Sequence, residues 1–384
     1  MHVLILPSWY PLHENDLNGC FFREQAHALA KKGTKVGVII PQFRSLRLGK
    51  KAICGKYNSE IWQDGDISTY FKHDVFWFPK IPYIDLNRWI NAGLKLFEKY
   101  IKEQGIPDII HVHSLLLAGP LALAIHKKYQ IPYCVTEHSS LYARGLIKNW
   151  EWKYLNNAAQ SASKLLAVSK SLTNILESKF NNTKWDIFPN LLDNIFTESS
   201  QRSFTTRKEQ LCAVGFLNKN KGFDLLIKAF AKVLQYSPQL KLCIGGDGPE
   251  KENLKNIIKD LKLEDSVFLL GSLARKDVCK LMNESKCFIL SSHVETFGIV
   301  VIEALSQGTP VVATLCGGPN SLLTPNDGVF VKPNDEADLA KGIMEYLNNQ
   351  DKFDHRKIRE RCISNYSEAA FAEKLMKIYT EIQS

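Results

Sequence analysis

The sequence predicts an α/β protein with two doubly wound parallel sheets, each in its own domain. Strand-like apolar runs alternate with helical patterns along the whole chain, which is typical of parallel strands joined by crossover helices. The 384 residues are too many for one ordinary core and fit two domains of roughly 150 to 200 residues. An apolar content of 45% is sufficient for both cores.

The first domain is predicted over residues 1–200. A helix over 21–32 is closed by Gly33, the residue type that most often ends helices. Residues 193–208 are rich in Ser and Thr and lack apolar periodicity, so we expect a linker there with its hinge near residue 200. The expected strands cover 3–6, 35–40, 108–112, 133–136 and 164–168, and a second helix lies near 120–128.

The second domain is predicted over residues 201–363 and repeats the same alternation of strands and helices. Its helices are expected over 223–234 and 250–262. Its strands are expected over 211–214, 241–244, 267–270, 288–290, 311–313 and 328–331. Two such sheets would each place loops at the carboxyl ends of their strands, where open parallel sheets bind ligands.

Composition argues against a membrane-spanning or disulfide-rich protein. The longest apolar runs are far shorter than the roughly 20 residues of a membrane span. Residues 1–7 lack the basic and long apolar regions of a signal peptide, so we expect a cytoplasmic location. The nine cysteines form no C-x-x-C pair and mostly stand in apolar contexts, which predicts reduced core residues instead of metal ligands.

The net charge of +9 is concentrated in the first half of the chain. Residues 1–195 hold 24 Lys and Arg against 16 Asp and Glu, a balance of +8, whereas the remainder holds 25 against 24. Such a surplus suits a phosphate-bearing acceptor or the anionic inner face of a membrane, although a merely soluble basic surface fits equally. Aromatic residues are not interleaved with the lysines, so we expect no nucleic-acid binding.

Glu295 and Glu303 carry the clearest functional signal. Residues 287–291 predict a buried strand and 299–307 an apolar helix that ends at Gly308, so Glu295 lies on the loop before that helix. Glu303 lies one turn into the helix among apolar residues, where a carboxylate without a partner is costly. A diphosphate bound at the helix N-terminus would leave one glutamate on each side for a sugar.

The surrounding motif resembles a known family. Residues 295–304 read Glu-x-Phe-Gly-x-x-x-x-Glu-Ala, and 308–314 read Gly-x-Pro-Val-Val-Ala-Thr. This string resembles the retaining glycosyltransferases of the large bacterial "glycosyl transferases group 1" family, glycosyltransferase family 4. The resemblance implies the GT-B fold, in which two Rossmann-like domains face a cleft. It also implies that residues 364–384 form a helix crossing back to the first domain, although an ordinary amphipathic end helix fits that stretch as well.

The resemblance assigns roles within the second domain. Glu295 would bind donor-sugar hydroxyls, and Glu303 would hold the ribose. Backbone N–H groups would be offered by Thr296, Phe297 and Gly298. Arg275, after the strand over 267–270, would contact the nucleotide base. The turn over 245–249 has a structural role, and the loop over 317–320 departs from the family pattern because Asn follows its proline.

A second motif follows the strand over 211–214. Gly215 permits close approach of the backbone to phosphate, and Lys221 matches the family's lysine, which stabilises the leaving diphosphate. Phe216 stands where the family has an arginine, so half of the expected cationic pair is absent. Lys219 is our candidate for its replacement.

In the first domain the resemblance implies three kinds of contact. Gly19 opens a helix, and its backbone would face the diphosphate. His138 follows the strand over 133–136, and the family's histidine there meets the transferred sugar. His111 and His113 end the preceding strand and could line the acceptor pocket, although histidines at strand ends often serve packing alone.

The implied function is metal-independent, retaining transfer of a sugar from a nucleoside-diphosphate sugar to a saccharide or lipid-linked acceptor. The setting would be cell-surface polysaccharide biosynthesis, with peripheral association at the inner membrane face. No cofactor is expected, and UDP, GDP and ADP all stay open as the nucleotide. The alternatives are a sugar-nucleotide epimerase, a phosphorylase that would need pyridoxal phosphate, and a non-catalytic partner that lost its arginine at Phe216.

Overall fold

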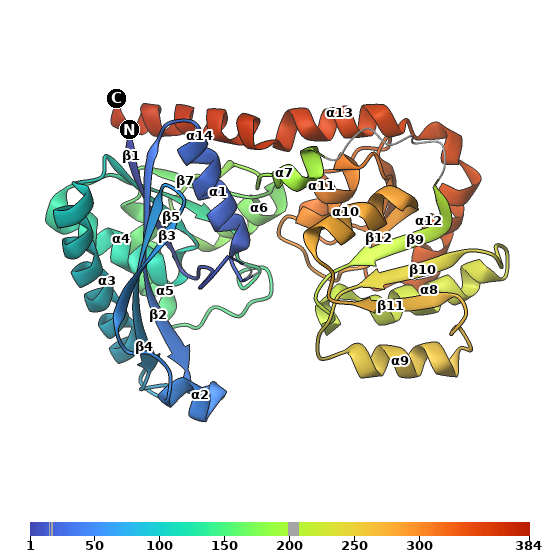
Figure 1. Cartoon of the computed structure of the whole chain (residues 1–384), viewed down its shortest axis with the longest axis horizontal. Helices are drawn as coiled ribbons and strands as arrows, with labels where there is room; N and C mark the ends of the chain where they lie inside the picture. The colour runs from blue at the N-terminus through green and yellow to red at the C-terminus, as the bar shows by residue number, and fades with distance from the viewer. Residues whose placement is uncertain (15, 17, 199–206) are drawn as a thin grey trace. The chain divides into compact units, whose positions relative to one another are not determined.

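The computed structural model describes residues 1–14, 16, 18–198 and 207–384, which divide into two compact units (Figure 1). Unit 1 comprises Met1–Val168, Thr173–Leu191 and Phe371–Ser384. Unit 2 comprises Ser169–Leu172 and Leu192–Ala370. The hinge expected near residue 200 lies outside the described residues. Each unit contains one sheet with helices, which confirms the predicted fold class.

Unit 1 is built on an eight-stranded sheet in the order β3-β4-β2-β1-β5-β6-β7-β8. All neighbouring strands are parallel except β3 and β4, which form an antiparallel hairpin at one edge. The strands are β1 (His2–Pro7), β2 (Lys35–Ser45), β3 (Ser59–Asp64), β4 (Ile67–Phe76), β5 (Ile109–His113), β6 (Tyr133–Glu137), β7 (Lys164–Ala167) and β8 (Asp186–Ile187).

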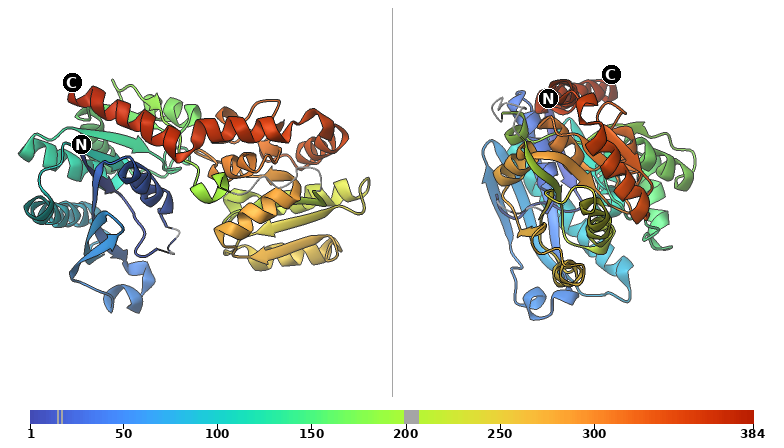
Figure 2. Two further views of the ribbon diagram at one scale, coloured as in Figure 1. Left: turned by 45° about the horizontal axis from the view of Figure 1, so that its top comes forward. Right: turned by 90° about the vertical axis from the view of Figure 1, so that its right-hand side faces the viewer.

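The helices of unit 1 complete its core. They are α1 (Cys20–Lys31), α2 (Lys50–Ile53), α3 (Pro82–Gln104), α4 (Leu115–Tyr129), α5 (Glu151–Gln160), most of α6 (Lys170–Lys179) and most of the last helix, α14 (Glu368–Gln383). Phe371, Leu375 and Tyr379 of α14 are buried in one cluster with Phe22 of α1 and the strands. Both ends of the chain therefore lie on unit 1 (Figure 2).

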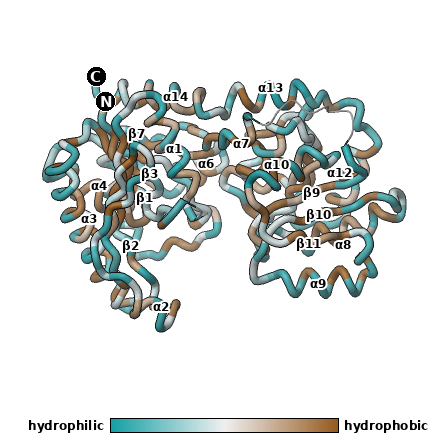
Figure 3. Tube along the Cα trace, viewed as in Figure 1, coloured by the Kyte–Doolittle hydropathy of each residue, from teal (hydrophilic) through white to brown (hydrophobic). Residues whose placement is uncertain are grey.

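Unit 2 is built on a six-stranded parallel sheet in the order β11-β10-β9-β12-β13-β14. Its strands are largely apolar (Figure 3). The elements in chain order are α7 (Asn194–Thr197), β9 (Lys208–Val214), α8 (Phe223–Leu234), β10 (Lys241–Gly245), α9 (Lys251–Asp260), β11 (Val267–Gly271), α10 (Arg275–Glu284), β12 (Ser285–Leu290), α11 (Ile299–Ser306), β13 (Val311–Thr314), β14 (Gly328–Val331), α12 (Glu336–Asn348) and α13 (His355–Tyr366).

The strand order creates a switch point in each sheet, a position from which the connections of two adjacent strands run in opposite directions. In unit 2 the chain leaves β9 toward β10 and leaves β12 toward β13, in opposite directions along the sheet. Right-handed crossovers therefore put α8 and α11 on opposite faces, which leaves a crevice beyond the carboxyl ends of β9 and β12. Unit 1 has the corresponding point between β1 and β5. Gly19 lies after β1, the predicted residues over 215–221 lie after β9, and those over 295–298 lie after β12.

The edge of unit 1 differs from expectation. We predicted neither the β3–β4 hairpin, where residues 59–76 mix charged and apolar side chains, nor α3, although the buried Leu86, Trp89, Leu96 and Tyr100 recur at helical spacing. Lys72 and Asp74, for example, lie on β4 between buried residues. Among the described residues no helix is both long and apolar enough to cross a bilayer. All nine cysteines are free thiols, and seven of them are buried.

Candidate functional site

The loop after β9 is joined to the loop after β12 in unit 2. Gly222 makes this approach possible: its φ is 61°, and a Cβ there would lie 2.3 Å from the carbonyl oxygen of Ser291. The backbone N–H of His293 donates to the carbonyl of Asn220 at 2.8 Å, and the Ser291 hydroxyl donates to the carbonyl of Lys221 at 2.9 Å. These bonds hold the η2 turn, Lys219–Lys221, against the end of β12.

Lys221 and Glu295 meet at this junction. The Lys221 Nζ lies 2.5 Å from Oε1 of Glu295, and the Ser292 hydroxyl donates to the same oxygen at 2.8 Å. Both side chains are mostly shielded, with 23% and 13% of their surfaces exposed. The two residues predicted to hold the diphosphate and the sugar are therefore neighbours, and each fixes the position of the other.

The backbone of Glu295 is supported from the other side by the loop over 316–318. The Glu295 N–H donates to the carbonyl of Cys316 at 3.0 Å, and its carbonyl accepts from the N–H of Gly318 at 2.8 Å. Gly318 lies against the backbone of Phe297, where a Cβ would come within 2.4 Å of Cα. The loop whose ligand role was uncertain from sequence thus supports Glu295 structurally.

The N-terminus of α11 presents unpaired backbone donors. Gly298 precedes the helix with a φ of 89°, and the N–H groups of Thr296, Phe297 and Gly298 donate to none of the described residues. The Phe297 side chain is buried beside the ring of Tyr366, so only its backbone is available to a ligand. Three free N–H groups beside a helix N-terminus favour an anion.

Glu303 lies on the second turn of α11 and is almost completely buried. Burial raises the pKa of its carboxyl group, while Arg275 acts in the opposite direction and Asp193 adds to the rise. Among the described residues its charged partner is Arg275, whose Nη2 lies 3.5 Å from Oε1 of Glu303. This long contact leaves the carboxylate able to accept closer hydrogen bonds from a ligand.

Arg275 connects Glu303 with the start of unit 2. Its Nε lies 2.8 Å from Oδ2 of Asp193, and its guanidinium lies over the ring of Phe196, 5.4 Å from the centroid. The sequence predicted Arg275 as a base contact, and the structure places it instead on two carboxylates. Asp193 was not predicted at all, because it and Arg275 are far apart in the sequence and share no motif.

The remaining residues of the β9 loop differ in exposure. Gly215 donates its N–H to the carbonyl of Gly245 at 3.0 Å, so the turn over 245–249 packs on this loop as a structural element, as predicted. Phe216 is 60% exposed and occupies the place of the missing arginine without a polar function. Lys219 is also exposed, and its ammonium group has no partner among the described residues.

In unit 1, three histidines lie together: His111 and His113 belong to β5, and His138 directly follows β6. The Nδ1 of His113 and the Nε2 of His138 are 3.1 Å apart, and the ring of His138 packs against Phe22. Burial lowers the pKa of His138 to about 3, and it lowers that of His113 well below the usual value. Both rings are therefore neutral near pH 7, and one of the two facing nitrogens carries the shared proton.

His111 differs from the expectation that it lines a pocket. Its Nδ1 pairs with the hydroxyl of Tyr379 at 2.6 Å and its Nε2 with that of Thr136 at 2.7 Å. The ring is fully buried, and burial lowers its pKa to about 3. Because both nitrogens are used inside unit 1, His111 ties α14 to the sheet.

Glu137 was not predicted, yet it organises the loop that carries His138. Its buried carboxylate accepts from the N–H of His138 at 2.9 Å, the N–H of Ser139 at 2.8 Å, the N–H of Leu115 at 2.9 Å and the Ser114 hydroxyl at 2.9 Å. Burial raises its pKa, while these four donors oppose the rise. The signal available in the sequence was a charged residue at the end of a buried strand.

Gly19 precedes α1 and adopts a left-handed conformation with a φ of 78°. A Cβ there would lie 2.9 Å from the side chain of Trp9 and 3.3 Å from its carbonyl oxygen. Only glycine fits such a position without strain. Among the predicted site residues, unit 2 brings together Lys221, Glu295 and the start of α11, whereas unit 1 brings together His113 and His138.

Comparison with known proteins gives two matching family models. The one described as "Glycosyl transferases group 1" matches residues 195–369, and the one described as "Glycosyltransferase Family 4" matches residues 21–194. The chain is 28% identical over 371 residues to TuaC of Bacillus subtilis, a glycosyltransferase named for teichuronic acid biosynthesis, covering 91% of this chain and 90% of TuaC.

Two further similarities come from a yeast and a cyanobacterium. The phosphatidylinositol N-acetylglucosaminyltransferase gpi3 subunit of Schizosaccharomyces pombe is 27% identical over 304 residues, covering 75% of this chain and 64% of that subunit. The solved structure of Anabaena HepE in complex with UDP superposes with a TM-score of 0.73 at 18% identity, covering 99% of this chain and 100% of HepE.

Proposed function

The chain belongs to the group 1 glycosyltransferases, and from that premise we propose that it is a retaining enzyme of cell-surface polysaccharide biosynthesis. It has the GT-B fold of this family and uses a nucleotide sugar. The proposed reaction transfers the sugar to a saccharide or lipid-linked acceptor. The observation that carries the proposal is the start of α11, where free N–H groups lie between Glu295 and Glu303.

The donor would bind along this helix end. The diphosphate would accept from the N–H groups of 296–298, where the helix dipole favours negative charge. The ribose hydroxyls would donate to Glu303, which gains a closer partner than Arg275 at 3.5 Å. Glu295, held by Lys221 and Ser292, would accept hydrogen bonds from the sugar.

The chemistry would use the cation already present. As the bond between the anomeric carbon and the β-phosphate oxygen breaks, Lys221 would stabilise the negative charge on the leaving diphosphate. The acceptor oxygen would bond to the same face of the anomeric carbon, and its proton would pass to the departing phosphate. Lys219 would supply the second cation in place of the missing arginine, and His138 would contact a sugar hydroxyl as a neutral ring. No metal is required by this arrangement.

The names of the similar proteins support the substrate classes. HepE was solved with UDP, TuaC is named for a wall polysaccharide, and the gpi3 subunit is named for transfer to a phosphatidylinositol. The match spans 64% of the gpi3 subunit. We therefore propose a nucleoside-diphosphate sugar as donor and a saccharide or lipid-linked saccharide as acceptor.

The exposed Phe216 favours one competing function, that of a non-catalytic partner. A thermal-shift panel of UDP, GDP and ADP comes first, because binding to the folded state raises the melting temperature. The sugar derivatives of the stabilising nucleotide are then tested for slow hydrolysis, with the anomeric form of the released sugar read by NMR. Stabilisation by one nucleotide with retention of configuration supports the proposal. Stabilisation without turnover would favour the non-catalytic partner, and inversion would overturn the retaining mechanism.

A further inference from the structure

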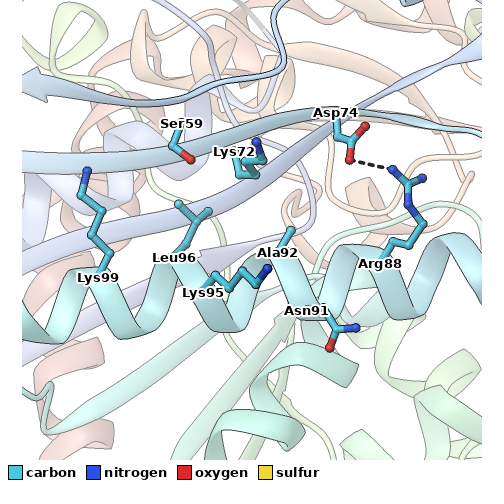
Figure 4. Close-up of a pocket in the computed structure, with 9 residues that line it drawn as sticks. All are labelled: Ser59, Lys72, Asp74, Arg88, Asn91, Ala92, Lys95, Leu96 and Lys99. Atoms are coloured by element: carbon cyan, nitrogen blue, oxygen red, sulfur yellow. Dashed lines mark hydrogen bonds and ion pairs between the residues drawn. The ribbon is translucent and has the colours of Figure 1, made fainter.

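A basic pocket lies at the edge of unit 1, apart from the residues discussed so far. It is formed between the β3–β4 hairpin and α3 and has a volume of about 480 Å³ (Figure 4). Its strands, β3 and β4, are separated from β1 by β2, whereas the histidine cluster belongs to β5 and the end of β6, on the other side of β1. The pocket is lined by Ser59, Lys72, Asp74, Arg88, Asn91, Ala92, Lys95, Leu96 and Lys99.

The cations of this pocket are only partly neutralised. Arg88 is paired with Asp74 at 2.6 Å and with Asp85 at 2.7 Å, so its charge is balanced within unit 1. Lys99 lies 3.9 Å from Glu103, a weak contact, and Lys95 has no partner among the described residues. Lys72 donates to a neutral carbonyl, that of Tyr57, at 2.5 Å. Three lysines therefore leave a positive surplus at the pocket.

An apolar loop adjoins the basic pocket. From the end of β4 into the first turn of α3, the side chains of Trp77, Phe78, Ile81 and Tyr83 are 39%, 41%, 40% and 51% exposed. Four large hydrophobic side chains exposed in seven residues indicate an interaction surface, whereas single ones would not. Lys80 lies among them and is exposed as well.

The loop is joined to the wall of the pocket through Asp85. The two carboxylate oxygens of Asp85 accept from the N–H groups of Trp77 at 3.1 Å and Phe78 at 2.7 Å. The same carboxylate pairs with Arg88 in the pocket wall. Asp85 is buried, so it fixes the loop backbone while the four side chains point to solvent.

We propose that this surface, the β4–α3 corner, binds an anionic phospholipid membrane. One lipid phosphate occupies the pocket beside Lys95 and Lys99, and the rings of Trp77 and Phe78 lie at the level of the headgroups. Aromatic and basic residues together suit the membrane interface, because the rings contact the apolar acyl chains while the lysines contact the hydrated, anionic headgroups. A soluble phosphate would account for the lysines but not for the apolar loop. Residues 44–102 carry eleven Lys and Arg against six Asp and Glu, a surplus of +5 that complements an anionic leaflet.

The test measures flotation of the full chain with vesicles of phosphatidylcholine alone and of equal parts phosphatidylcholine and phosphatidylglycerol. We expect binding to the anionic vesicles only, weakening as salt is added. The double variant Lys95→Gln/Lys99→Gln should lose about 25-fold in affinity, at roughly fivefold for each lysine near the surface. The matched control is Lys228→Gln/Lys259→Gln, which removes the same charge from exposed positions of α8 and α9 in unit 2 and should lose little.

The loop is tested with Trp77→Ser/Phe78→Ser, which keeps the two backbone bonds to Asp85. This variant should also bind anionic vesicles more weakly. The proposal is overturned if the control pair loses as much as the pocket pair, or if neutral vesicles bind equally well. It is also overturned if the loop variant binds normally while inorganic phosphate displaces the vesicles, since the ligand would then be a soluble phosphate.

This inference is independent of the donor site. A Glu303→Ala variant should bind vesicles like the wild type, and the pocket variants should keep their melting shift with the stabilising nucleotide. Failure of either proposal therefore leaves the other intact. The nucleotide shift also shows that a pocket variant is folded.

Discussion

Replacing Glu303 by alanine should separate donor binding from stability. The buried carboxylate has one long contact to Arg275, at 3.5 Å, and a bound ribose would give it closer hydrogen bonds. A hydrogen bond to a charged group contributes about 1.5–3 kcal/mol, so losing one or two should cost about 2–4 kcal/mol of affinity after competition from Arg275. That corresponds to a Kd for the nucleoside diphosphate raised roughly 30- to 1000-fold.

The same change should affect folding far less. Arg275 keeps its partner Asp193 at 2.8 Å, so no cation is left unpaired when Glu303 is removed. Loss of the carboxylate also removes the cost of burying it, which offsets much of the cavity that alanine leaves. We expect the unfolding free energy to change by no more than about 2 kcal/mol. Glu303→Gln, which keeps the volume and one acceptor, should be intermediate in affinity.

The assay is isothermal titration calorimetry with the nucleoside diphosphate that stabilises the wild type most. Glu264→Ala is the matched control, because it removes a carboxylate from an exposed position of unit 2 outside the proposed donor site. It should bind that ligand nearly as the wild type does. Wild-type affinity in a folded Glu303→Ala protein would refute the assignment of Glu303 to the ribose.

The remaining predictions concern the cations and the buried groups. Lys221→Met should lower kcat about 100-fold or more and Lys219→Met less, measured by donor hydrolysis, whereas an equal loss in Lys228→Met would contradict the assignment. Glu137→Gln should reduce the unfolding free energy, measured in urea, by about 1–3 kcal/mol. The NH2 group of the glutamine would face a backbone N–H that now donates to the carboxylate, so two donors would oppose each other. The unfolding free energy should fall between about pH 7 and pH 5. Burial lowers the pKa of His111 and of His138 to about 3 in the folded protein, whereas the pKa of an unfolded histidine is about 6.5. Below about pH 6.5, protons therefore bind preferentially to the unfolded chain. The loss is about 2 kcal/mol for each histidine at pH 5, and an unchanged urea midpoint would contradict burial of the neutral rings.

Sequence patterns predicted the elements that pack locally and missed those that depend on distant partners. The helix expected over 299–307 is α11, Ile299–Ser306, because its apolar run is closed by glycines at both ends. The strand expected over 328–331 has the same bounds in the structure. By contrast, the β3–β4 hairpin is an edge element whose charged residues obscured its alternation, and α3 was missed although its buried residues recur at helical spacing.

The candidate site shows the same division. Lys221 and Glu295 are neighbours because their loops follow β9 and β12, which lie side by side at the switch point of the sheet. The second partner of Arg275, Asp193, depends on tertiary packing that no spacing reveals. The burial of His111 depends on Tyr379, a residue of the last helix, so a strand-end histidine could not be distinguished from a pocket residue by sequence.

The position of α14 has a consequence for how the protein is made. Phe371, Leu375 and Tyr379 belong to the core that also contains Val3 and Ile5 of the first strand. During synthesis, the first half of the chain leaves the ribosome long before these residues exist, so unit 1 must wait with part of its core open. Unit 2 needs none of the residues after Ala370 and can fold earlier. Unit 1, whose synthesis begins first, is therefore completed last. While its core is open, its exposed apolar surface is the part of the chain that most needs a chaperone.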